Sequence, residues 1–533
     1  MTALNSSSLR RELGLAALLA FATGATVGVT KLLQILLTTP GNRFFTTSEA
    51  VAEEFIVAFG FSKAVGNLIA GTLSDRYGRR VCMATGWLCG AAFSGLILLC
   101  QSWSYVVWCD LLLGLNQALC WSAALFIAHD VLATQRGFAS GLVETMGYAA
   151  IAIASPVVDA LGAGAFDVCH TALLALCVGC AVVTVMAVRE TRPGSKSSRG
   201  TAHNGGIECT AADSSSNRDG TAVREWPKGS RDEASAVGPA RTSCLEPGLM
   251  ACCLVGLCLN LATAYAWGAM TRWLARHNVD ISSSSSRETG GSGLSLGSVL
   301  LLYSIPKGVL QLPAGLLADT YLGARALVLS GVLGCASTLA TLAAVTAIAD
   351  AALADVAGAA GASSAMDGAP RPSRVAVSSA ASSAFGILAF LLGASTACAY
   401  SPVIACVAAR ARPEHRASAV ATYRFWRDLG YSVGALLLGN AADGLSASGS
   451  SSSGDWSAPL LAALALVAAA AVFARYYVSS DANFPGETQR RARCRSESRG
   501  LAAFDGARFA REVQLSSIST SPSPSTSVSR GVA

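Results

Sequence analysis

Long apolar stretches occupy most of this 533-residue chain and constrain its fold more than any other feature. A helix needs about 20 mostly apolar residues to cross a hydrocarbon core of about 30 Å. Only 14% of the residues are charged and the mean hydropathy is +0.48, values that are unusual for a soluble globular protein. The sequence therefore predicts an all-α membrane protein with twelve transmembrane helices. The stretches are residues 12–36, 50–73, 81–101, 104–128, 137–161, 168–188, 246–272, 294–318, 323–349, 379–408, 417–441 and 457–478.

Two blocks of six stretches are separated by a polar segment. We expect a short N-terminus (1–11), an N-terminal six-helix bundle (12–188), a linker (189–245), a C-terminal six-helix bundle (246–478) and a tail (479–533). The linker and the tail are rich in Ser, Gly and charge, so they have little to pack, and both are predicted to be disordered.

The two blocks also look like copies of each other. The loop Gly71-Thr-Leu-Ser-Asp75-Arg-Tyr-Gly-Arg-Arg80 recurs in degraded form from Gly315 to Arg325, and Lys63 and Lys307 each precede the first glycine of their copy by eight residues. Residues 112–122 align without gaps on residues 391–401. This agreement predicts two pseudo-symmetric bundles, as in transporters built from repeats.

The loop pattern G-x-x-x-D-R-x-G-R-R resembles the signature of the major facilitator superfamily. This resemblance implies a secondary transporter in which helices two, five, eight and eleven line the interface between halves, helices one, four, seven and ten line the cavity, and the others face lipid. The segments 114–122 and 423–431 look like a mostly prokaryotic permease subgroup whose substrates are largely unassigned. Departures from proton-coupled drug exporters are Asp110, where an Arg is usual, and a reduced Pro motif at Ser155-Pro156.

The resemblance also implies a gating motif on the loops. Asp75 would accept hydrogen bonds at the start of the eleventh helix, near Ala417 and Ser418, and Arg79 would pair with Asp130. In the second copy Thr320 replaces the arginine, so this copy lacks part of the gating motif. The candidate gating residues are Gly71, Asp75, Arg76, Gly78, Arg79, Arg80, Asp130, Asp319 and Arg325.

Charged residues near the middle of the bilayer form a second candidate site, since a charge in hydrocarbon costs several kcal/mol on insertion scales. Either they bind substrate or a proton, or they form fixed ion pairs between the halves, with Lys63–Asp428 and Lys307–Glu144 as the expected pairs. Glu144 is the expected proton carrier, and the excess of bases favours an anionic or zwitterionic solute. The candidate pathway residues are Lys63, Asn67, Asn116, Gln117, Glu144, Lys307, Gln311, Arg424, Arg427 and Asp428.

The distribution of Lys and Arg predicts the orientation. Short loops on the side of Arg76 and Arg136 carry more of these residues than the opposite loops, which places both termini in the cytoplasm; the sequence does not say which membrane. The net charge of +6 follows from this topology and the tail, and does not indicate nucleic acid. Most of the 17 cysteines lie in apolar stretches and predict no disulfide framework.

No nucleotide-binding loop, nucleophile constellation or metal-ligand cluster is evident, so we expect neither an enzyme nor a cofactor or metal. The prediction is a monomeric, proton-coupled transporter that moves a small organic solute by alternating access, with efflux as one direction open to it. A uniporter is the first alternative. A non-transporting sensor or scaffold on a transporter fold is the second.

Overall fold

The computed structural model describes residues 6–132, 135–191, 246–274, 294–320, 323–361, 374–411, 416–447 and 456–481. Every regular element in these ranges is a helix. They are α1 Ser6–Leu37, α2 Glu49–Tyr77, α3 Arg79–Ile97, α4 Trp103–Val131, α5 Arg136–Leu161, the 3₁₀ turn η1 Ala163–Ala165, α6 Phe166–Ala187, α7 Pro247–Trp267, α9 Leu296–Val309, α10 Gln311–Thr320, α11 Ala324–Gly361, α12 Arg374–Arg410, α13 Arg416–Ala447 and α14 Ser457–Asp481. Most of the predicted linker and tail, 192–245 and 482–533, lies outside the described residues.

Each of the twelve predicted stretches falls on this helical framework, so the predicted fold class is confirmed. Eleven helical segments are long and apolar enough to cross a membrane. One of them, Leu296–Ala318, joins α9 and α10, which are separated at Leu310 because Pro313 cannot donate a hydrogen bond to Val309. The long helix outside this set is α13, whose apolar character is reduced by three buried charges, Arg424, Arg427 and Asp428.

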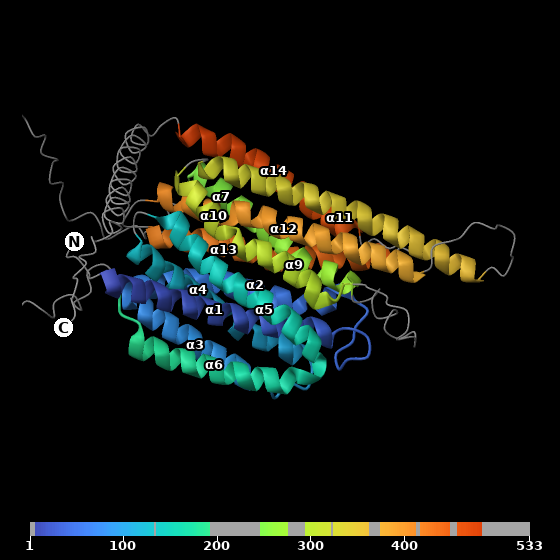
Figure 1. The fold of residues 1–533 in the computed structure, drawn as a ribbon, viewed down its shortest axis with the longest axis horizontal. Helices are drawn as coiled ribbons and strands as arrows, with labels where there is room; N and C mark the ends of the chain where they lie inside the picture. The colour runs from blue at the N-terminus through green and yellow to red at the C-terminus, as the bar shows by residue number, and fades with distance from the viewer. Residues whose placement is uncertain are drawn as a thin grey trace, which may run out of the picture. The chain divides into compact units, whose positions relative to one another are not determined.

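The helices group into an N-terminal and a C-terminal set (Figure 1). Between the sets, α2 packs along α13, and α5 packs along α9 and α10. The fraction of residues that are buried separates interior from peripheral helices. In the most apolar 18 residues of each helix it is 83% for α4 and for the α7 segment (Pro247–Leu274), but only 28% for the segment Ala163–Ala187 that contains α6. Large apolar side chains are exposed on most of the helices, α3, α6, α11 and α14 among them, as expected for a bundle surrounded by lipid.

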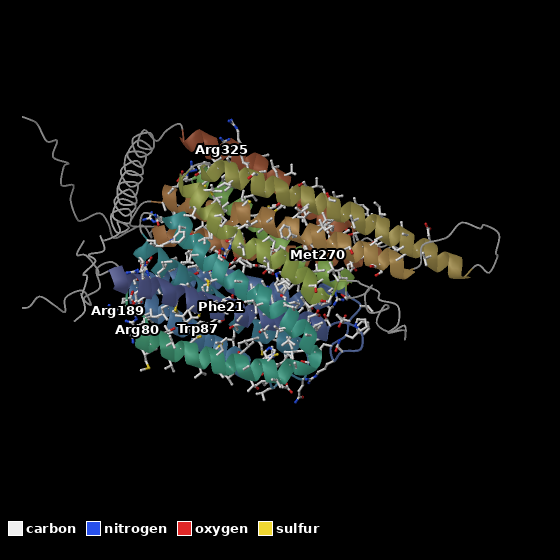
Figure 2. All side chains as sticks on the ribbon, viewed as in Figure 1. Phe21, Arg80, Trp87, Arg189, Met270 and Arg325 are labelled. Atoms are coloured by element: carbon white, nitrogen blue, oxygen red, sulfur yellow. The ribbon has the colours of Figure 1, made fainter. Side chains whose placement is uncertain are left out.

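The two copies of the repeated loop lie at the same end of the helices. Arg80 from the first copy and Arg325 from the second are both near this end, and Met270 lies towards the other (Figure 2). We call the end with Arg80 the motif end, and the end with the α1–α2 loop the opposite end. In the motif, Gly78 separates α2 from α3 with φ of +106°, a conformation that side chains other than glycine rarely adopt.

Close helix contacts depend on glycine in several places. On α1, Gly24 lies directly against the backbone of Gly147 on α5, so a Cβ atom at Gly24 would overlap it. On α13, Gly430 packs in the same way against the carbonyl of Leu257 on α7. Small residues allow this approach, which gives membrane helices much of their packing energy.

Replacing Gly24 by valine is therefore expected to destabilise the N-terminal set by about 1–3 kcal/mol or more, because rigid backbone leaves the new side chain no space. The matched control is Gly179→Val on α6, where a Cβ atom meets nothing within 4 Å. Thermal unfolding of both variants in detergent, followed by size-exclusion chromatography, measures the difference. Equal stability of the two variants would contradict this packing account.

Candidate functional site

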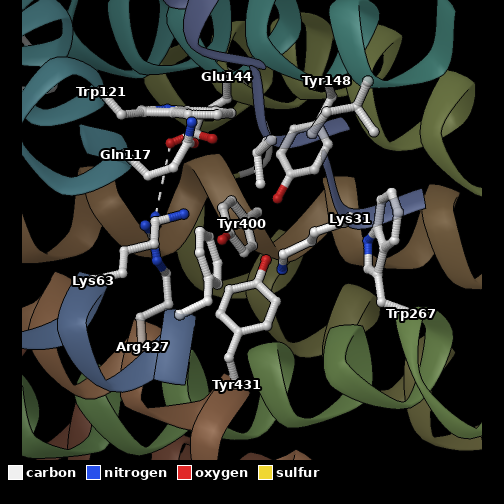
Figure 3. A pocket seen from close by; sticks show the side chains of 13 residues that line it. Lys31, Lys63, Gln117, Trp121, Glu144, Tyr148, Trp267, Tyr400, Arg427 and Tyr431 are labelled. Atoms are coloured by element: carbon white, nitrogen blue, oxygen red, sulfur yellow. Dashed lines mark ion pairs between the residues drawn. The ribbon is translucent and has the colours of Figure 1, made fainter. Parts of the chain in front are cut away.

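A cavity lies between the two sets of helices, and its walls come from α1, α2, α4, α5, α7, α12 and α13 (Figure 3). It leaves only about 20 Å³ for the centres of water molecules, room for one or two. The cavity is therefore small in this conformation. Its lining residues are Val27, Lys31, Phe59, Lys63, Gln117, Trp121, Glu144, Tyr148, Ile151, Trp267, Tyr400, Arg427 and Tyr431.

Lys31 and Lys63 face aromatic rings in this cavity. The ammonium of Lys31 lies 3.9 Å from the ring centre of Phe59 and 4.6 Å from that of Tyr431. The ammonium of Lys63 lies 5.3 Å from the centre of Phe59 and 5.4 Å from that of Trp121. These cation–π contacts stabilise a desolvated cation only in part. Within the described parts of the chain, neither lysine forms an ion pair.

Lys307 is buried at the edge of the same region. Its ammonium donates hydrogen bonds to the hydroxyl of Tyr303 at 2.8 Å and to that of Thr263 at 3.1 Å, and it lies 4.5 Å from the ring centre of Tyr148. All of these partners are neutral. The three lysines therefore come from α1, α2 and α9, and they point towards the interior of the protein and not towards lipid.

The buried carboxylates are held by Arg427. The guanidinium of Arg427 binds both oxygens of Asp428, at 2.7 and 2.9 Å, and lies 3.7 Å from Glu144 on α5. Asp428 also accepts hydrogen bonds from the amides of Asn67 at 2.8 Å and Asn260 at 2.9 Å. The contact with Glu144, drawn as a dashed line in Figure 3, joins the two sets of helices.

Arg424 is fully buried and only partly satisfied. Its Nε donates to the side-chain oxygen of Asn67 at 3.2 Å. Its two terminal nitrogens have no hydrogen-bond partner among the described residues. Asn67 also accepts a hydrogen bond from Ser122 at 3.0 Å, so it connects α2, α4 and α13.

The predicted ion pairs Lys63–Asp428 and Lys307–Glu144 are not formed, so both predictions were wrong. Arg427 takes both carboxylates because its planar guanidinium can bind Asp428 through two nitrogens at once and still reach Glu144. Both lysines face aromatic rings and hydroxyls instead. Neither lysine is therefore paired with a carboxylate among the described residues.

The predicted polar residues divide between packing and cavity. Asn116 donates to the backbone of Gly86 at 2.9 Å and does not line the cavity. Gln117 does line it, and donates to the carbonyl of Thr23 at 2.7 Å. Gln311 accepts a hydrogen bond from Ser401 at 3.0 Å, outside the cavity lining.

Two further buried groups, Lys31 and Asp110, lie outside the set of predicted pathway residues. Apart from Glu12 at its start, Lys31 is the only charged residue of the first apolar stretch, and that isolation is the signal that could have revealed it. Asp110 on α4 is fully buried, and both of its oxygens accept from the amide of Gln34, at 2.8 and 2.9 Å. A polar pair on two cavity helices has no sequence signature of its own.

At the motif end, Arg79 is the centre of the candidate gate. It pairs with Asp130 at 3.1 Å, as predicted, and with Asp75 at 3.0 Å. Glu190 accepts hydrogen bonds from the backbone amides of Arg79 and Arg80, and Thr191 donates to Asp130 at 2.9 Å.

The remaining gating residues are less constrained. Gly71 is buried, and Arg76 is exposed. The side chains of Ala417 and Asp319 lie outside the described residues, so the expected contact of Asp75 with the start of α13 and the second copy of the gating motif stay predictions.

Comparison with known proteins agrees with this architecture. Residues 13–275 match the model of the Major Facilitator Superfamily. A mutant of the nucleoside transporter NupG has a similar structure, with a TM-score of 0.53, 12% identity, and coverage of 88% of this chain and 100% of that one. The human organic anion transporter MFSD10 (TETRAN) gives a TM-score of 0.55, 13% identity, and coverage of 87% and 99%. No curated protein matches the sequence.

The chain is therefore a multi-pass integral membrane protein of the transporter class. Over residues 13–275 it is similar to the major facilitator superfamily, as the repeated loop predicted.

Removal of Arg427 should destabilise the protein. In Arg427→Met two buried carboxylates lose their cation, so we expect a loss of about 3–5 kcal/mol. Arg427→Gln combined with Asp428→Asn removes both members of the pair and should recover part of the loss. The control is Arg475→Met, at an exposed position on α14. Thermal unfolding in detergent compares the four proteins, and equal midpoints for Arg427→Met and Arg475→Met would refute the central role of Arg427.

Proposed function

We propose that this protein is a secondary transporter that moves a small organic anion or zwitterion across the membrane by alternating access, coupled to a proton. The observation that supports this most is an excess of buried basic side chains around the central cavity. Five basic side chains, Lys31, Lys63, Lys307, Arg424 and Arg427, accompany three acidic ones, Asp110, Glu144 and Asp428. Because burying an unpaired charge is costly, an anionic ligand would stabilise this region.

The lining of the cavity suits an organic ligand with an apolar body. Trp121, Trp267, Tyr148, Tyr400 and Tyr431 surround the ammonium groups. Such a ligand could place its ring against these aromatic faces and its carboxylate near Lys31 or Lys63. The present cavity is too small for it, so binding requires the two sets of helices to separate at one end.

Glu144 is the proposed proton carrier. It lines the cavity, its Oε1 atom accepts no hydrogen bond from the described residues, and its distance of 3.7 Å to Arg427 is too long for a strong charge-assisted bond. Asp428 is a poorer candidate, since it accepts bonds from Arg427, Asn67 and Asn260 at once.

The gate at the motif end is proposed to act through Arg79, Asp130 and Asp75. The bias of Lys and Arg towards the motif-end loops supports a cytoplasmic position for this end and for both termini. Opening towards the cytoplasm would then disrupt the predicted contact of Asp75 with the start of α13.

Flux into proteoliposomes tests the proposed substrate class. A panel of radiolabelled aromatic carboxylates should enter vesicles that contain the protein, faster than labelled quaternary ammonium compounds. Lys31→Met or Lys63→Met should lower apparent affinity about tenfold or more, because a bond to a charged group contributes about 1.5–3 kcal/mol. Lys228→Met, in the predicted linker, is the control. Preference for the cations, or no flux for any solute, would contradict the proposal.

Proton coupling is tested separately by Glu144→Gln. This variant should lose the stimulation of uptake by a pH gradient while still exchanging internal for external labelled solute, because only the titrating group has been removed. Wild-type uptake that ignores the pH gradient would identify a uniporter. A Glu144→Gln protein that still responds to the gradient would exclude this residue as the carrier.

A further inference from the structure

A second charged cluster closes the opposite end of the bundle. Arg272 lies near the end of the α7 segment, which is α7 together with the helical residues that follow it (Pro247–Leu274). It donates from Nε to Glu49 at 2.7 Å, from Nη1 to the hydroxyl of Thr38 at 3.0 Å, and from Nη2 to the carbonyl of Thr46 at 3.1 Å. All three partners belong to the N-terminal set of helices, and Arg272 and Glu49 are both buried. Each nitrogen of this guanidinium is therefore occupied across the interface.

A reciprocal contact lies beside it. Asp443, near the end of α13, accepts hydrogen bonds from the hydroxyl of Ser48 at 2.6 Å and from the backbone amides of Glu49 at 2.8 Å and Ala50 at 3.1 Å. These groups form the N-terminus of α2, where a carboxylate is stabilised by the helix dipole. The C-terminal set thus supplies one cation and one anion to the same short segment of the N-terminal set.

Glu53 lies one helical turn after Glu49 on α2, and its hydrogen bonding differs from that of Glu49 and Asp443. It is 1% exposed and forms no hydrogen bond or ion pair with any residue that the structure describes. Its carboxylate faces Gly268 so closely that a Cβ atom there would overlap it. The charged groups around it are Glu49 on its own helix, Arg272 from the α7 segment and Asp443 from α13.

The charge balance of this cluster is unfavourable if every group is ionised. Three carboxylates, Glu49, Glu53 and Asp443, would share one guanidinium. Glu49 is paired with Arg272 and Asp443 is bound by amide donors, whereas Glu53 has neither. A buried carboxylate without a partner is costly, while its protonated form removes the net charge.

We propose that Glu53 is a proton-binding site that controls closure of the opposite end. When this end is open, water hydrates Glu53 as a carboxylate. Closure brings Arg272 onto Glu49, expels the water, and Glu53 takes one proton from the adjacent solution to become a neutral carboxylic acid. Opening returns that proton. The site is separate from the cavity and goes beyond the proposed function, since it requires no particular substrate.

The thermodynamic linkage between proton binding and closure gives the size of the pH effect. If closure takes up one proton, the closed state gains about tenfold in population for each unit that the pH falls, over the range in which the open form is ionised and the closed form is protonated. Acid conditions therefore favour closure. In Glu53→Gln the side chain is neutral at every pH, so the end should stay closed.

Hydrogen–deuterium exchange of the full chain in lipid nanodiscs tests this. Peptides that cover residues 38–55 and 264–274 are compared between pH 5.5 and pH 8, after correction for the intrinsic dependence of exchange on pH. The wild type should be protected about tenfold or more at the lower pH. Glu53→Gln should be protected at both pH values. The matched control is Glu54→Gln, at the exposed neighbouring position, which should behave as the wild type.

Infrared spectroscopy provides a second test of the protonation of Glu53. Spectra of the wild type at neutral pH should contain a band from a protonated carboxyl group that is lost in Glu53→Gln and kept in Glu54→Gln. A wild type whose protection ignores pH, a Glu53→Gln variant that keeps the full response, or an unchanged infrared band would overturn the proposal. Loss of flux alone would not, so failure here is distinguishable from failure of the proposed transport activity.

Discussion

The cost of placing charge in a bilayer is the constraint on which the rest of this structure depends. It forces α13, which carries two arginines and an aspartate on buried positions, between α2 and α7. There Arg427 meets Asp428 on its own helix and Glu144 on α5. One guanidinium thus hydrogen-bonds Asp428, lies 3.7 Å from Glu144 and joins the two sets of helices. These contacts stabilise α13 inside the bundle, although it is less apolar than the eleven segments that could cross a membrane.

Because Arg427 lies beside Asp428 and Glu144, the three buried lysines have no carboxylate partner among the described residues. Lys31, Lys63 and Lys307 rest on aromatic rings and hydroxyls, which are weaker partners than a carboxylate. This is an arrangement that structural ion pairing alone does not explain, since a fixed pair would use the acid nearest to each lysine. It is explained if a ligand supplies the missing negative charge during part of the cycle.

Sequence reasoning succeeded where the signal is long or repeated. The twelve helices follow from apolar length, and the Arg79–Asp130 contact from the motif. It failed where two side chains compete for the same partner. Lys63 and Asp428 lie on neighbouring helices, yet Arg427 binds the aspartate. Lys31 was missed since one lysine barely alters a long apolar window, and the Arg272 cluster because its residues are scattered from Thr38 to Asp443.

The two ends of the bundle are held by different kinds of contact, and this bears on how the halves separate. At the motif end, Arg79 pairs with Asp75 and Asp130, which all belong to the N-terminal set. At the opposite end, Arg272 and Asp443 cross directly between the sets. Separation there must break several buried charge-assisted bonds together, which is strongly unfavourable unless water enters at the same time. Hydration of Glu53 on opening would offset part of that cost, so that loss of its proton and loss of the Arg272 contacts would occur in one step.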